Sequence, residues 1–93
     1  MLRISEVGLS NGRKTLRLEG EVIGTGVAEV GQLVERMLAA GEALTMDLAE
    51  LLFVDREGVN LFRELAQRHV EFVNCSPFLN EQLKGATHSG EQR

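Results

Sequence analysis

The 93-residue sequence has no tryptophan, no tyrosine, four phenylalanines and a single cysteine. With few side chains that could stack on bases and a net charge of −4, it lacks the features of a nucleic-acid or anionic-membrane surface. Cys75 cannot form an internal disulfide, and no CxxC or Cys/His spacing suggests a zinc or redox site. We therefore expect neither a metal nor a cofactor.

Long hydrophobic runs are absent as well. The longest apolar stretches, such as residues 51–54, are far too short to span a bilayer, and the first eight residues lack the apolar centre of a signal peptide. An apolar fraction of 43% still suffices for one core. The sequence predicts one cytoplasmic domain over residues 1–85 and a flexible tail over residues 86–93, which have no apolar period.

Alternating polar and apolar residues predict strands. Residues 2–9 and 14–22 alternate, and Asn11-Gly12 between them favours a tight antiparallel hairpin. Further strands are expected at residues 42–48 and 70–75. The residues that these patterns place on buried faces are Leu2, Ile4, Leu16, Leu18, Val22, Leu44, Met46 and Leu48.

Three other stretches follow a helical period. The first begins near Thr25, a plausible N-cap, and ends at Gly41. The second follows Asp55 and places His69 on its apolar face. The third begins with Ser76-Pro77 and ends at Gly85. The order β-β-α-β-α-β-α predicts an α/β fold, a small mixed β-sheet with packed helices.

The titratable residues do not form a catalytic set. His69 is interpreted as a packed or helix-capping histidine, and Asp47 with Glu50 as a solvated strand end. No Ser/His/Asp or Cys/His combination is evident, so we do not expect an enzyme. The loop Gly24-Thr25-Gly26 lies where a dinucleotide loop would lie, but Glu29 occupies the place of the third glycine. Small-ligand or nucleotide binding remains an alternative.

The most unusual stretch is Asp55-Arg56-Glu57-Gly58, where charged residues follow an apolar run. Asp55 can cap the helix that follows, and Glu57 complements the helix dipole. Gly58 is unfavourable within a helix by about 1 kcal/mol relative to alanine. Its presence predicts the close approach of another backbone or of a partner.

Three patches together resemble the STAS domain, named for sulfate transporters and anti-sigma factor antagonists. They are "LRLEGEV" before a helix, "TMDLAELLFVDREGV" with its Asp-x-x-Gly-apolar turn, and "VEFVNCSPFLNEQLKG" with a serine-initiated last helix. The resemblance extends from Leu2 to Gly85. It implies a cytoplasmic protein-interaction module without catalytic activity.

In the anti-sigma factor antagonists that the chain resembles, a partner kinase phosphorylates the serine after the aspartate. That position is Arg56 here, and the next hydroxyl residue of the turn is replaced by Glu57. Ile23 stands where an aspartate is usual, in the adjacent loop of Ile23, Gly24 and Thr25. The partner-binding residues that the resemblance implies are Asp55, Arg56, Glu57, Gly58, Val59, Asn60 and Leu61.

The leading hypothesis is an anti-sigma factor antagonist-like regulator in a partner-switching or related signalling system, without the usual phospho-switch. Its partner would be an anti-sigma factor or a kinase-like regulator. The alternative is a STAS accessory subunit of a bacterial transporter ATPase, whose permanent partner would need no switch.

Overall fold

A computed structural model describes residues 1–89 of the chain, with side chains as far as residue 83. The predicted element order and the α/β class are confirmed. The elements are β1 (Leu2–Ser10), β2 (Arg13–Val22), α1 (Thr25–Ala39), β3 (Ala43–Val54), α2 (Arg56–Gln67), β4 (Glu71–Val73) and α3 (Pro77–Ser89).

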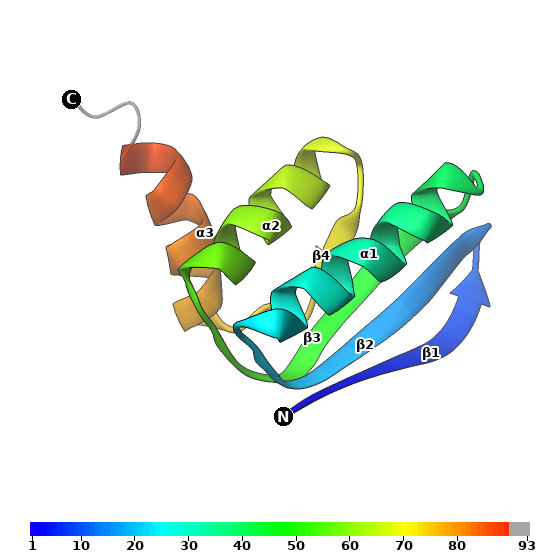
Figure 1. Ribbon diagram of the computed structural model, residues 1–93. Helices are drawn as coiled ribbons and strands as arrows, with labels where there is room; N and C mark the ends of the chain where they lie inside the picture. The colour runs from blue at the N-terminus through cyan, green and yellow to red at the C-terminus, as the bar shows by residue number, and fades with distance from the viewer. Residues whose placement is uncertain (90–93) are drawn as a thin grey trace.

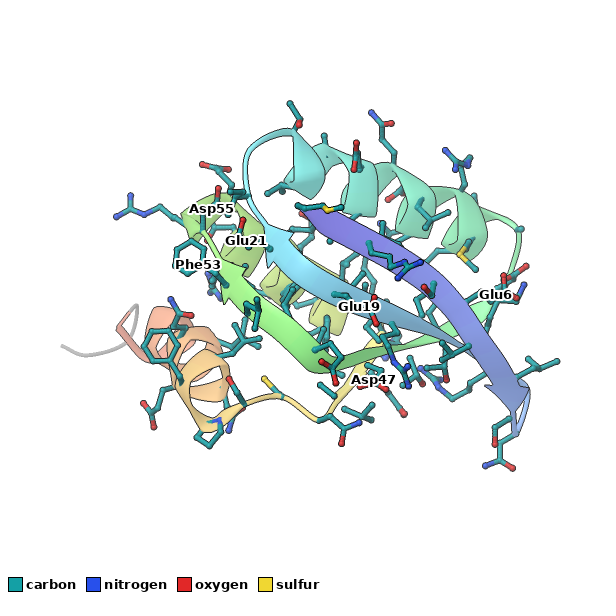
Figure 2. The ribbon with its side chains drawn as sticks, turned by 90° about the horizontal axis from the view of Figure 1, so that it is seen from below. Glu6, Glu19, Glu21, Asp47, Phe53 and Asp55 are labelled. Atoms are coloured by element: carbon teal, nitrogen blue, oxygen red, sulfur yellow. The ribbon has the colours of Figure 1, made fainter. Side chains whose placement is uncertain are left out.

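The sheet is mixed, as expected from a hairpin followed by crossover units. Its four strands lie in the order β1-β2-β3-β4. The β1–β2 pair is antiparallel, whereas β2–β3 and β3–β4 are parallel. Helices α1 and α2 lie on one face, and α3 lies beside α2 at the end of the molecule away from β1 (Figure 1). Figure 2 looks onto the opposite face, which carries charged side chains such as Glu19 and Asp47.

The core lies between the sheet and the helices. Alternate residues of β2 and β3 point into it, so the period-two prediction for these strands is confirmed. Helices α1 and α2 contribute one apolar stripe each. The fully or almost fully buried members are Leu16, Leu18, Val22, Val30, Val34, Leu44, Met46, Leu48, Val54, Phe62 and Leu65.

Left-handed residues make two of the predicted turns. Asn11 (φ 55°) and Gly12 (φ 77°) close the β1–β2 hairpin. Gly41 (φ 87°) ends α1, where its N–H donates to the Leu38 carbonyl. The Thr25 N-cap prediction is wrong: Gly24 is the N-cap, and no side chain caps this helix. Thr25 already lies within the first turn.

Helix α2 ends before His69, so the prediction that His69 lies on the apolar face of this helix is wrong. The helix stops at Gln67, and His69 is exposed with φ 71°. The Val70 N–H donates to the Leu65 carbonyl over 3.1 Å, which reverses the chain and buries Val70 instead. The helical period predicted the wrong buried residue because it was extended past the point where the backbone leaves the helix.

The last strand and helix also have different bounds from those predicted. Strand β4 covers Glu71–Val73 only, and Asn74 follows with φ 58°. Ser76 caps α3 as predicted, because its Oγ accepts from the Leu79 N–H at 3.1 Å. The helix continues past Gly85 to Ser89, so the predicted end is wrong. An interior glycine costs only about 1 kcal/mol and need not end a helix.

The predicted flexible tail, residues 86–93, is only partly covered by the structure. Residues 86–89 belong to α3, whereas residues 90–93 lie outside the described part of the chain. The domain boundary at residue 85 and the flexibility of the tail therefore stay predictions.

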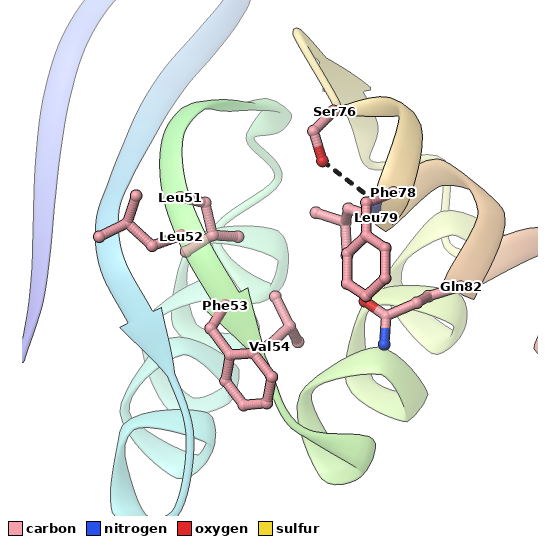
Figure 3. A pocket seen from close by; sticks show the side chains of 8 residues that line it. All are labelled: Leu51, Leu52, Phe53, Val54, Ser76, Phe78, Leu79 and Gln82. Carbon is pink, nitrogen blue, oxygen red and sulfur yellow. Dashed lines mark hydrogen bonds between the residues drawn. The ribbon is translucent and has the colours of Figure 1, made fainter.

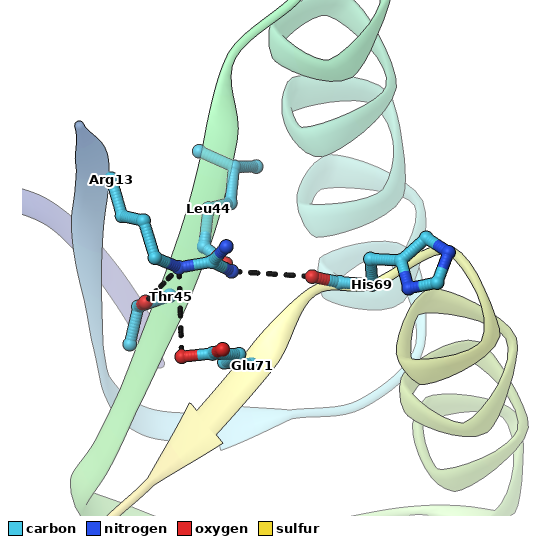
Figure 4. Close-up of polar contacts among 5 residues, drawn as sticks. All are labelled: Arg13, Leu44, Thr45, His69 and Glu71. Carbon is cyan, nitrogen blue, oxygen red and sulfur yellow. Dashed lines mark hydrogen bonds and ion pairs between the residues drawn. The ribbon is translucent and has the colours of Figure 1, made fainter. Parts of the chain in front are cut away.

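Arg13 holds three strands together at the end of the sheet opposite Asp55 (Figure 4). Its guanidinium donates to the Leu44 carbonyl, to Thr45 Oγ1 at 3.1 Å and to the His69 carbonyl at 3.2 Å. Glu71 on β4 completes the set as an ion-pair partner at 3.5 Å. This cluster adds an ion pair to the backbone pairing that holds the short strand β4 against β3.

Asp47 is buried, so its interpretation as a solvated strand end is wrong, although Glu50 is exposed. Its Oδ1 accepts from the Asn74 side chain and from the Ala49 N–H, each at 3.0 Å. Arg17 Nε lies 3.6 Å from Oδ2. The Asn74 and Ala49 hydrogen bonds and the Arg17 charge favour the carboxylate and lower the pKa of Asp47.

This lowered pKa predicts a loss of stability in acid. The carboxylate stabilises the fold above the ordinary pKa of 3.8, and its contribution is lost as the pH falls through the lower folded-state value. We expect Asp47→Asn to lower the free energy of unfolding by about 1–2 kcal/mol near neutral pH. The difference from wild type should shrink as the pH is lowered below about 4. Urea unfolding across this pH range measures it.

Glu35 provides the control for this prediction. It forms an exposed ion pair with Arg68, so Glu35→Gln should change stability much less than Asp47→Asn. A difference between wild type and Asp47→Asn that stays constant down to the lowest pH would contradict the assignment.

Candidate functional site

The turn between β3 and α2 is organised by the Asp55 carboxylate. Its Oδ1 accepts from the Gly58 N–H at 2.8 Å, which caps α2 as predicted. Its Oδ2 accepts from the Gly24 N–H at 3.0 Å, in the loop between β2 and α1. The Asp55 N–H also donates to the Val22 carbonyl. One side chain thus holds two loops, 31 residues apart in sequence, as one surface.

Gly58 lies where α2 passes over the ends of β2 and β3. A Cβ at this position would lie 2.5 Å from Val54 Cγ1 and 3.0 Å from the Val22 carbonyl oxygen. Of the two explanations that the sequence allowed, the structure shows close approach of the chain's own backbone. The glycine lets the first turn of α2 pack directly on the sheet.

The residues that the resemblance implied for partner binding divide into two groups. Arg56, Glu57 and Asn60 are exposed, and Asp55 and Leu61 are half-buried. The neighbouring Ile23, Gly24 and Thr25 are exposed as well. Gly58 and Val59 are buried, so they support this surface from below and are not accessible to a partner. We call the accessible part the turn surface. It consists of residues 23–25, residues 55–57, Asn60 and Leu61.

The Gly24–Gly26 loop does not form a phosphate site. The Gly24 N–H donates to Asp55, the Gly26 N–H to the Ile23 carbonyl, and the Val27 N–H to the Gly24 carbonyl. These amides are occupied, and the Asp55 carboxylate beside them would repel an anion. The structure therefore gives no support to the nucleotide-binding alternative.

The described residues also offer no evident centre for metal or thiol chemistry. No group of three His, Cys, Asp or Glu side chains among them could hold a metal ion. Burial raises the pKa of the Cys75 thiol, which keeps it protonated and poorly nucleophilic.

The structure also shows an apolar surface that the sequence interpretation missed. The sequence describes residues 51–54 only as an apolar run before Asp55, and the structure shows that Leu52 is 80% exposed and Phe53 49% exposed. Gly20 pairs with Leu51 and Glu21 with Phe53, so Leu52 is the extra residue of a bulge. The break in alternation at residues 51–54 was the available signal, because a regular half-buried strand would not carry four apolar residues in succession.

Together with the first turns of α3, these residues line a groove at the end of β3 (Figure 3). Phe78 on α3 is 68% exposed and faces this groove. Figure 2 places Phe53 at the same end of the sheet as Asp55 and Glu21. We call this feature the apolar groove; its lining residues are Leu51, Leu52, Phe53, Val54, Ser76, Phe78, Leu79 and Gln82.

Comparisons with known proteins find the fold and little else. No protein-family model matches the chain, and no curated protein sequence matches it. Among solved structures, the chain has the STAS fold of the anti-sigma factor antagonists. One match is the anti-sigma factor antagonist SpoIIAA in its unphosphorylated form, with a TM-score of 0.66 and 21% identity, covering 90% of this chain and 82% of that one.

A second match is an anti-sigma factor antagonist from Mycobacterium paratuberculosis. It has a TM-score of 0.65 and 15% identity, covering 92% of this chain and 78% of that one. The resemblance read from the sequence is thus confirmed at the level of the fold. No helix within the described residues is long and apolar enough to cross a membrane.

Proposed function

We propose that this protein is a non-catalytic, cytoplasmic interaction module that acts as an anti-sigma factor antagonist-like regulator. Its partner, an anti-sigma factor or a kinase-like regulator, contacts the turn surface, and no phosphate is transferred to residue 56. The fold shared with anti-sigma factor antagonists supports this proposal. The main support for the proposal is the Asp55 carboxylate, which accepts hydrogen bonds from both loops. It thereby holds them as one preorganised surface.

The chemistry of the turn supports the absence of a phospho-switch. Arg56 has no hydroxyl group, and Glu57 beside it is a carboxylate. A phosphate would add close to two negative charges at the start of α2, whereas Arg56 places one positive charge there. The helix dipole disfavours that charge, so Arg56 contributes little to the fold and is available for contact.

The proposal is tested by recovering partners from a native lysate with tagged wild type and with Arg56→Ala/Glu57→Ala. Both side chains are exposed, so the variant should fold normally. We expect recovery of the main partner to fall by at least about tenfold, as for loss of a central contact.

A matched control is Glu29→Ala/Arg36→Ala, which removes the same two kinds of charge from exposed positions of α1. It should leave recovery unchanged. Equal recovery with wild type and the turn variant would remove the turn surface from the interface. Recovery of a membrane-associated ATPase as the main partner would favour the accessory-subunit alternative.

A further inference from the structure

The apolar groove is a large exposed apolar feature without an assigned role. Leu52, Phe53 and Phe78 are 80%, 49% and 68% exposed, and they surround a groove lined without any charged side chain. Together these side chains expose on the order of 400 Å² of apolar surface, the size at which a patch on a small protein is often functional. A patch of this kind reduces solubility unless it is covered by another molecule.

The outer edge of β3 limits the kind of segment that can cover the apolar groove. Strand β4 pairs only with Thr45–Asp47, so no strand of the described chain pairs with the outer edge of β3 beyond that point. The bulge at Leu52 interrupts the regular spacing that an added strand would need. Recognition through side chains in the groove is therefore favoured over strand addition.

The surrounding charges are mostly negative. Glu50 precedes the groove on β3, Glu57 follows it in the first turn of α2, and Glu81 lies one turn beyond Phe78 on α3; all three are exposed. Over residues 50–57 and 77–84 of the sequence the acidic residues are Glu50, Asp55, Glu57 and Glu81, and the basic residues are Arg56 and Lys84. In a twofold contact between two copies of the chain, the glutamates beside one groove would face those beside the other, and this repulsion opposes self-association. A partner that carries basic residues would instead be attracted to these glutamates.

We propose that the apolar groove binds an amphipathic helix of a partner protein that carries lysine or arginine beside its apolar stripe. Leu52, Phe53 and Phe78 accept the apolar stripe, and the glutamates meet the basic residues. This surface adjoins the turn surface but does not depend on it. A partner could occupy either surface alone or both.

The probe for this proposal is a fluorescein-labelled helical peptide of about 14 residues, built of leucine and lysine with a helical period. Fluorescence anisotropy should show saturable binding to wild type and much weaker binding of the leucine–glutamate counterpart. Leu52→Ser/Phe78→Ser should weaken binding of the basic peptide by at least about tenfold. Both side chains are largely exposed, so this variant should keep its stability, which urea unfolding verifies.

The control variant is Val7→Ser/Leu9→Ser, which removes exposed apolar side chains from β1. It should bind the basic peptide like wild type. Equal binding to wild type and the groove variant, or no saturable binding at all, would overturn the proposal. So would sedimentation showing a wild-type dimer that the groove variant abolishes, because a second copy would then be the occupant. Arg56→Ala/Asn60→Ala changes exposed residues of the turn surface and leaves all three glutamates in place. It should retain peptide binding, so a failure of the turn surface as an interface does not affect this test.

Discussion

Gly58→Ala is expected to destabilise the protein by roughly 1–3 kcal/mol, the usual cost of overpacking a well-packed core. The new Cβ would lie 2.5 Å from Val54 Cγ1 and 3.0 Å from the Val22 carbonyl oxygen. The valine side chain has little room to move because Val54 is buried, and the carbonyl belongs to the backbone. Relief of the clash requires the first turn of α2 to move away from the sheet. Urea unfolding monitored by circular dichroism measures the change.

The same substitution at Gly31 is the control. A Cβ there would lie 3.6 Å from Leu61 Cδ1, which is ordinary van der Waals contact. Gly31→Ala should therefore stabilise α1 by up to about 1 kcal/mol through helix propensity. If both variants were stabilised, the packing assigned to Gly58 would be wrong. The alanine would keep its backbone N–H, but displacement of the first turn of α2 would disturb the hydrogen bond from residue 58 to Asp55, so Gly58→Ala should weaken partner recovery as well, whereas Gly31→Ala should not.

Phe62→Ala is expected to have the largest effect on stability, a loss of roughly 3–5 kcal/mol. Phe62 is fully buried, and its ring centroid lies 5.3 Å from that of Phe72 on β4. Its removal leaves a cavity between α2 and the sheet and takes away a contact that holds the short strand β4. Since a domain of this size has a total stability of about 5–15 kcal/mol, the variant should be partly unfolded at moderate temperature.

Phe78→Ala provides the matched comparison, because Phe78 is 68% exposed. Its loss should change the free energy of unfolding by no more than about 0.5 kcal/mol. Similar losses from both variants in urea or thermal unfolding would mean that the apolar groove is part of the core. The comparison therefore separates a side chain that supports the fold from one that is available for binding.

The turn surface and the apolar groove lie at the same end of the sheet, where β3 ends. The Asp55 carboxylate holds the loops of the turn surface, while Gly58 lets α2 approach the sheet closely. The bulge at Leu52 and the early end of β4 expose the groove beside them. The two surfaces are therefore adjacent and differ in chemistry, because the turn surface carries charged and polar side chains and the apolar groove is lined by no charged side chain.

The features that were predicted correctly from the sequence depend on interactions between near neighbours. The Asn11-Gly12 turn, the Gly41 helix end, and the Asp55 and Ser76 caps each involve residues within a few positions of one another. The alternation in β2 and β3 and the stripes of α1 and α2 determined the order of elements and most of the core. These local rules sufficed for the fold class and for the position of the turn.

The features that could not be predicted depend on residues far apart in the sequence. Asp47 is buried and ionised because Arg17 and Asn74, 30 and 27 positions away, supply its partners. Leu52 is exposed because it is the extra residue where the pairing of β3 with β2 shifts, and four apolar residues in succession show that alternation breaks but not which of them is exposed. Asp55 reaches Gly24 only after β2 and β3 have paired. Strand pairing brought these groups together, and a sequence pattern does not specify its register.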